Sequence, residues 1–236
     1  LLATEAGFRL GRRGPKESEA GGTGAIDGAI FALLGLLLAF TFSGAASRFD
    51  DRRSLVAEES NAIGTAYLRL DLLPEEAQPA LRALFRDYVE ARLAAYADMG
   101  DADATAAAWR RSSELQQRIW GAAVAAVRDD RRTALQPAVL GPINEMIDIT
   151  TTRHMATLTH PPMVVFVMLG LSAVLAALLA GVAMGRSGRR AWLHAACFAL
   201  MVGGAVYLIL DLEFPRLGLI RVDGADVVLQ ELRRAM

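Results

Sequence analysis

The sequence predicts an all-α integral membrane protein whose long helices leave the bilayer and continue into a helical extramembrane domain. Three nearly uncharged runs indicate the membrane segments, because a helix needs about 20 apolar residues to cross the hydrocarbon core. These runs are residues 24–47, 161–185 and 191–211. Apolar and polar residues do not alternate over five or more positions, so the sequence predicts no strand.

The chain opens on Leu1-Leu2-Ala3-Thr4-Glu5, which is typical of the end of an apolar helix. We therefore expect residues 1–23 to hold the end of a truncated N-terminal membrane helix, followed from residue 9 by a charged, glycine-containing loop. The intact protein would then have four membrane helices. A removed signal peptide is the competing explanation.

The first complete membrane helix, residues 24–47, is the most informative segment because nothing interrupts it where it leaves the membrane. Residues 48–53 (RFDDRR) are almost all charged, yet no Gly-Pro pair or capping residue precedes them. Helix-compatible sequence continues to about Leu72, which gives a helix of about 73 Å at 1.5 Å per residue. This length is more than twice the thickness of the hydrocarbon core, so we expect one helix to join the membrane segment to the extramembrane domain.

The remaining elements follow from apolar periodicity and from the two later apolar runs. Residues 48–160 are expected to form a helical extramembrane domain, with apolar side chains at helical spacing in each helix. Residues 161–185 and 191–211 then form two membrane helices joined by a short basic loop, residues 186–190. Residues 212–236 are expected to be a C-terminal tail.

The charge balance excludes some partners but does not decide the orientation. The formal net charge of −1 argues against a nucleic-acid partner. If the N-terminal segment spans the membrane, seven basic residues lie in the two short loops on one side of the bilayer. Six basic residues lie near helix ends on the other side. The positive-inside rule therefore leaves the side of the helical domain undecided. The single cysteine, Cys197, cannot form an intrachain disulfide.

The sequence around the membrane exit, FTFSGAASRFDDRRSLVAEESN, resembles the second transmembrane segment of bestrophins. The matching positions are Ser43, Arg48, Phe49, Asp51, Arg53, Leu55 and Asn61. Two aromatic residues of the bestrophin pattern are replaced, by Asp50 and Val56. The stretches 61–74 and 211–223 extend the similarity, over most of the chain, to an uncharacterised bacterial family of bestrophin-like proteins.

This resemblance implies a homo-oligomer, with five subunits as in bestrophins, in the inner membrane of a bacterium. It also implies passive conduction of small anions such as chloride, without a cofactor, through a neck lined by the 24–47 helix. Ala32, Leu36 and Phe40 lie at i, i+4 and i+8, so one helix face presents all three to the neck. Rings of apolar side chains can gate by dewetting. The alternative is that this face packs against neighbouring helices or lipid.

The arginines of the RFDDRR segment have two interpretations. At a pore mouth, Arg48, Arg52 and Arg53 would attract anions. Alternatively, these arginines pair with Asp50, Asp51 or other neighbours three or four residues away and anchor the helix at the headgroups.

A second polar face precedes the third membrane segment. Asn144, Asp148 and Thr152 recur at helical spacing and could form an ion-binding or gating face. The alternative is a hydrogen-bond network between helices. The histidines nearby, His154 and His160, have no metal-ligand spacing, so we predict no metal site.

The sequence contains no nucleophile elbow, no phosphate-binding glycine loop and no paired cysteine and histidine, so we do not expect an enzyme. One alternative to a channel is a non-conducting membrane sensor or scaffold, whose helical bundle binds a ligand or a partner. Another is a bestrophin-derived fold that no longer conducts, because kinship of fold does not establish activity.

Overall fold

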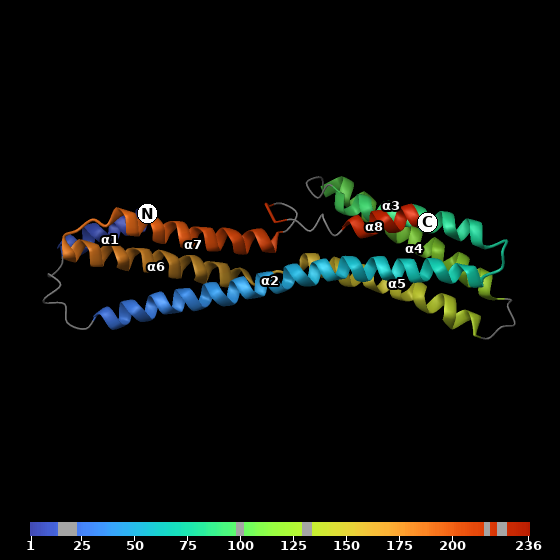
Figure 1. The fold of residues 1–236 in the computed structure, drawn as a ribbon, viewed down its shortest axis with the longest axis horizontal. Coiled ribbons are helices and arrows are strands. Elements are labelled where there is room, and N and C mark those ends of the chain that lie inside the picture. Colours follow the sequence, from blue (N-terminus) through green and yellow to red (C-terminus); the bar gives the residue numbers. More distant parts are fainter. Residues whose placement is uncertain (14–22, 98–101, 129–133, 215–217, 221–225) are drawn as a thin grey trace. The chain divides into compact units, whose positions relative to one another are not determined.

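The computed structural model describes residues 1–13, 23–97, 102–128, 134–214, 218–220 and 226–236. Within these ranges the chain is helical and contains no strand, which confirms the all-α prediction (Figure 1). The elements are α1 (Leu2–Arg13), α2 (Thr23–Arg69), the short 3₁₀ turn η2 (Leu70–Leu72), α3 (Gln78–Ala97), α4 (Ala102–Arg128), α5 (Leu135–Leu158), α6 (Met163–Ser187), α7 (Trp192–Glu213) and α8 (Val227–Ala235).

The helices form two compact units. Unit 1 comprises residues 1–48 and 160–214, and unit 2 comprises residues 49–159 and 215–236. Helix α2 contributes to both units, because it runs for 47 residues without a break. The prediction that one helix continues out of the membrane segment is therefore confirmed.

Three helical segments within the described residues are long and apolar enough to cross a membrane. They are Gly24–Leu72, Leu135–Ser187 and Trp192–Glu213, whose most apolar stretches are only 6, 11 and 11% buried in the single chain. Helices with so much uncovered apolar surface need lipid or protein around them. Helix α6 ends at Ser187 and is followed by Gly188, whose φ of +69° favours glycine.

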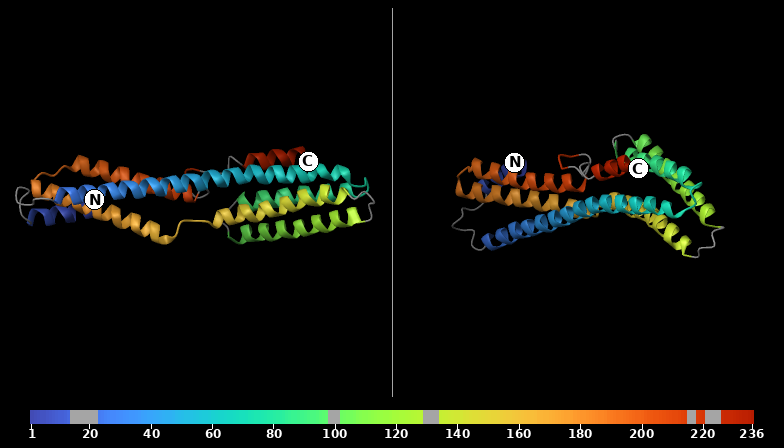
Figure 2. Two further views of the ribbon diagram at one scale, coloured as in Figure 1. Left: turned by 90° about the horizontal axis from the view of Figure 1, so that it is seen from below. Right: turned by 45° about the vertical axis from the view of Figure 1, so that its right-hand side comes forward.

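In unit 1, the short helix α1 lies along α6 (Figure 2). Gly7 and Gly11 of α1 meet Gly181 and Gly185 of α6 so closely that a Cβ on any of them would lie between 2.0 and 2.3 Å from a backbone oxygen of the other helix. Small residues four apart on both helices allow this contact. It holds α1 helical to Arg13, so the prediction of a loop from residue 9 is wrong for residues 9–13. Residues 14–22 lie outside the described ranges.

In unit 2, the second half of α2 packs with α3, α4 and α5 around a buried core. Its largest apolar side chains include Ile63, Phe85, Tyr88, Ile119, Ile143 and Met146. The predicted C-terminal tail contains a helix, α8, which inserts the fully buried Leu229 into this core. Tyr67 and Arg86 donate hydrogen bonds to the main-chain oxygen of Met236 over 3.0 and 2.9 Å, which fixes the end of α8.

Candidate functional site: the exposed face of α2 and the ion pairs beside it

The three residues predicted to line a neck lie on one uncovered face of α2. Ala32 is exposed, and Leu36 and Phe40 are 52% and 68% exposed in the single chain. The same face continues at intervals of three or four residues with polar side chains, all of them exposed: Ser43, Ser47, Asp50, Ser54 and Glu58. We call this set of residues, from Ala32 to Glu58, the α2 stripe. It changes along the helix from apolar to hydroxyl-bearing to acidic.

Arg48 lies on the side of α2 away from the stripe and pairs with Glu213 at the end of α7. Its Nε donates to Glu213 Oε1 over 2.7 Å, and its Nη2 donates to the same oxygen. The Glu213 side chain is fully buried. Gly44 lies one turn before Arg48, where a Cβ would approach Arg48 Nη1 to 3.2 Å. Arg48 is therefore held in a charge-assisted contact between α2 and α7.

His160 reaches the same carboxylate from the start of the α6 segment. Its Nδ1 lies 3.3 Å from Glu213 Oε2, and its ring stacks on Phe214 with centroids 4.8 Å apart. Both oxygens of Glu213 thus have a nitrogen partner in unit 1. This contact joins α2, the residue segment before α6 and the end of α7.

Arg52 is buried and holds the end of α5. Its Nε donates to the carbonyl oxygen of Ala156 over 3.0 Å, and its Nη2 donates to that of Thr159 over 2.9 Å. A cation is favourable there, because the last carbonyls of a helix have no partner within the helix. Arg53 is exposed, with its guanidinium carbon 6.0 Å from the Phe49 ring centroid.

The structure therefore does not bring the three predicted mouth arginines together. Arg48 and Arg52 make structural contacts, and Arg53 alone is exposed. Whereas the sequence suggested partners three or four residues away, the contacts described for Arg48 and Arg52 run to Glu213 and to α5. Those partners lie more than 100 residues away in the chain, where local spacing gives no signal.

The predicted polar face of α5 is present but is exposed. Asn144 Nδ2 donates to Asp148 Oδ2 over 2.9 Å, and Thr152 Oγ1 donates to the Asp148 carbonyl oxygen over 3.2 Å. These bonds stay within α5. The buried polar residues of α5 are instead Thr150 and Arg153, which lie on another side of the helix.

Arg153 belongs to a buried ion network that sequence analysis missed. Glu59 of α2 accepts a hydrogen bond at Oε1 from Arg92 Nε over 2.5 Å, and another at Oε2 from Arg153 Nη1. Arg153 Nη2 also donates to Asp226 Oδ1 over 3.1 Å. The side chains of Glu59 and Arg92 are fully buried, and that of Arg153 is 4% exposed. One carboxylate thus connects α2, α3 and α5.

Aromatic rings enclose the two arginines of this network. The guanidinium carbon of Arg92 lies 4.5 Å from the Trp109 centroid, and that of Arg153 lies 3.8 Å from the Tyr96 centroid. Arg92 Nη2 also donates to the Tyr96 hydroxyl over 3.0 Å. Cation–π contacts of this kind strengthen when they are removed from water.

The electrostatics of the network favour the ionised forms. Burial raises the pKa of Glu59, but the charges of Arg92 and Arg153 outweigh burial and hold the pKa below its usual value. Burial likewise lowers the pKa of Arg92, but Glu59 together with Tyr96 and Tyr88 outweighs burial, so the pKa is raised overall. With Asp226 included, the two arginines and two carboxylates carry no net formal charge. The network is suited to holding helices together.

A polar triad lies one helical turn from the network. The Tyr88 hydroxyl and Thr150 Oγ1 are 2.8 Å apart, and Gln116 Nε2 donates to both, over 3.2 and 3.1 Å. Burial raises the pKa of Tyr88, so its hydroxyl stays protonated. Among the described residues, no group of three histidine, cysteine, aspartate or glutamate side chains is placed to hold a metal ion.

These features define an all-α membrane protein in which one helix serves both units. A family model of the Bestrophin-like domain matches residues 3–226, and the chain belongs to this family. The fold is similar to that of a crystal structure of a point variant of a membrane protein, with a TM-score of 0.72 and 14% identity over 99% of this chain and 94% of that chain. No curated protein matches the sequence.

Proposed function

We propose that the protein is an oligomeric membrane channel that conducts small ions passively, with the α2 stripe lining the pore. The observation that carries this proposal is the exposure of the stripe along an unbroken helix, including Leu36 and Phe40. A homo-oligomer, with five subunits as the resemblance to bestrophins implies, would turn this face toward a common axis. The activity needs no enzymatic step and no cofactor.

The order of side chains along the stripe supports a narrow apolar neck followed by a polar vestibule. Leu36 and Phe40 from several subunits would form rings that exclude water unless the pore widens. The hydroxyl groups of Ser43 and Ser47 would follow, and these can replace water at a passing ion. We propose anions of the chloride type as the permeant ions, as the resemblance implies.

A second candidate, conduction of cations, is favoured by the charges on the stripe. Asp50 and Glu58 are exposed on it, whereas Arg48 and Arg52 are engaged in contacts on the opposite side of α2. Rings of carboxylates favour cations at a pore mouth. Arg53, beside the stripe, is the exposed residue that would favour anions.

Ion flux into liposomes that contain the purified full chain tests the channel and its selectivity. Under a potassium chloride gradient, the sign of the reversal potential separates anion from cation conduction. Phe40→Ala should raise the conductance because it widens the neck. Phe42→Ala is the matched control, since Phe42 is 41% exposed on a different face of α2. No flux from folded, oligomeric protein would favour the sensor or scaffold alternative.

A further inference from the structure

A basic and aromatic surface lies at one end of unit 1, where α1 and α6 end and α7 begins. The described residues there include six arginines: Arg9, Arg12, Arg13, Arg186, Arg189 and Arg190. Glu5 is the acidic residue among them, and it pairs with Arg9 over 3.0 Å and with Arg190 over 3.4 Å. Arg12, Arg13 and Arg189 are exposed, and none pairs with a described carboxylate. The surface therefore has an excess of positive charge.

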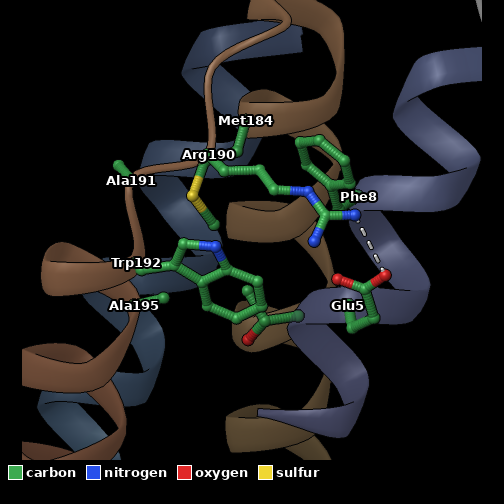
Figure 3. A pocket seen from close by; sticks show the side chains of 8 residues that line it. Glu5, Phe8, Met184, Arg190, Ala191, Trp192 and Ala195 are labelled. Carbon is green, nitrogen blue, oxygen red and sulfur yellow. Dashed lines mark hydrogen bonds and ion pairs between the residues drawn. The ribbon is translucent and has the colours of Figure 1, made fainter.

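Arg190 is held in a fixed position at the centre of this surface. Its guanidinium carbon lies 4.3 Å from the Phe8 ring centroid and 5.4 Å from that of Trp192 (Figure 3). Glu5 contacts the same group, as the dashed line in Figure 3 shows. The side chain remains 43% exposed, so an outside group can still reach its donors. Rings on either side reduce the entropy that Arg190 would lose on binding an anion.

The same residues border a small, open hollow of about 20 Å³ whose walls are largely apolar. Thr4, Glu5, Phe8, Met184, Arg190, Ala191, Trp192 and Ala195 line it. This volume is far below that of a pocket that encloses a ligand, so a bound group would lie on the exposed surface around the hollow and not inside it. Trp192 is 54% exposed, and tryptophan is enriched at the level of lipid headgroups. Helices α6 and α7, which flank the hollow, are both apolar enough to cross a bilayer.

We propose that this surface binds the phosphate group of an anionic phospholipid, with Arg190 as the central donor and Arg12 and Arg189 as flanking charges. The phosphate would lie on the Arg190 guanidinium at the rim of the hollow, and the glycerol and first acyl carbons would pack on the exposed Trp192, while the buried Phe8 holds Arg190 in place. Clusters of basic residues next to membrane helices attract anionic lipid. All residues of the proposed site belong to unit 1. The proposal does not depend on whether the protein conducts ions.

The test measures lipid binding to the detergent-purified full chain by native mass spectrometry and by thermal stability. Phosphatidylglycerol should bind and raise the melting temperature, whereas phosphatidylcholine should not. The double variant Arg12→Gln/Arg189→Gln should bind phosphatidylglycerol about tenfold more weakly, since two surface charges are lost. Arg12→Lys/Arg189→Lys should retain binding, because it keeps the charge.

The matched control is Arg110→Gln/Arg111→Gln, which removes two exposed arginines from α4 in unit 2. It should bind phosphatidylglycerol as the unmodified chain does. An equal loss of binding in this control would overturn the assignment of the site to unit 1. Equal binding of both lipids would overturn the preference for an anionic headgroup. Stabilisation by soluble glycerol phosphate, as strong as that by the lipid, would show that a free phosphate is the ligand and would also overturn the proposal.

Discussion

Arg92 donates from Nε to Oε1 of Glu59 over 2.5 Å, and both side chains are fully buried. A charge removed from water is tolerated only when it is paired and hydrogen-bonded, because desolvation costs several kcal/mol per ion. Glu59 meets this condition twice, since Arg153 donates to its other oxygen. In unit 2, one buried carboxylate is therefore shared by two buried arginines.

Removing this charge should destabilise unit 2. We expect Glu59→Gln to cost about 3–5 kcal/mol of unfolding free energy, because Arg92 stays buried without an opposing carboxylate and Arg153 keeps only Asp226. Thermal unfolding of the detergent-solubilised protein measures the loss. Glu58→Gln is the control, because Glu58 is exposed at the preceding position of α2. Equal melting temperatures for the two variants would contradict a stabilising role for Glu59.

The same pair predicts a dependence of stability on pH. Since the pKa of Glu59 is lower in the folded protein than in the unfolded chain, the unfolded state takes up a proton first as the pH falls. The contribution of Glu59 is complete above the unfolded value of about 4.3 and is lost as the pH drops through the lower folded value. Unfolding measured between neutral pH and pH 3 should show the gap between the unmodified chain and Glu59→Gln closing in acid. A gap that stays constant would contradict this linkage.

The contact between α1 and α6 should not tolerate a single added methyl group. A Cβ at Gly181 would lie 2.1 Å from the Thr4 carbonyl oxygen, so Gly181→Ala must push the helices apart. We expect a loss of about 1–3 kcal/mol or more, as is typical of overpacking. Gly170→Ala on the same helix is the control, because no neighbour lies within 4 Å of the position of its Cβ. The melting temperature of Gly181→Ala should be lower than that of Gly170→Ala. Equal melting temperatures would contradict the close contact between α1 and α6.

Arg48 and Glu213 should be energetically coupled. In a double-mutant cycle, Arg48→Met and Glu213→Gln should each lower stability, and the double variant should lose less than the sum, with a coupling of about 1–3 kcal/mol. Arg53→Met, which removes the exposed arginine, should have little effect on stability. Additive losses for Arg48 and Glu213 would mean that the pair does not hold α2 to α7.

The sequence predicted those features that depend on local pattern. The membrane segments, the unbroken helix α2 and the shared face of Ala32, Leu36 and Phe40 all follow from composition and helical period. The similarity to bestrophin-like proteins also followed from a local motif, and the family match confirms it.

Two missed features had a local signal. Gly7 and Gly11, like Gly181 and Gly185, have the four-residue spacing of close-packed membrane helices. This spacing could have predicted that α1 extends through residues 9–13. The stretch of α8, from Val227 to Ala235, contains leucines at positions 229 and 232, a spacing that is typical of a helix with one buried face.

The buried network had no such signal. Glu59 and Arg153 are 94 residues apart, and Glu59 and Arg92 are 33 apart, so only the tertiary fold brings them together. In the sequence, Glu59 follows Glu58 in a charged stretch and is typical of a solvated face. The partners of Arg48 and Arg52 also lie on segments that are remote in sequence, so local sequence patterns could not predict them.

The most direct test of the central claim is whether a charged thiol reagent blocks ion flux through residues of the α2 stripe. Cys197 is the single cysteine, so Cys197→Ala provides a background without reactive thiols. In that background, Leu36→Cys should lose its flux when the reagent reacts, because the added group would occupy the neck. Phe42→Cys, on a different face of α2, should conduct as before. Block at Phe42→Cys but not at Leu36→Cys, with both thiols shown to react, would contradict a pore lined by the stripe.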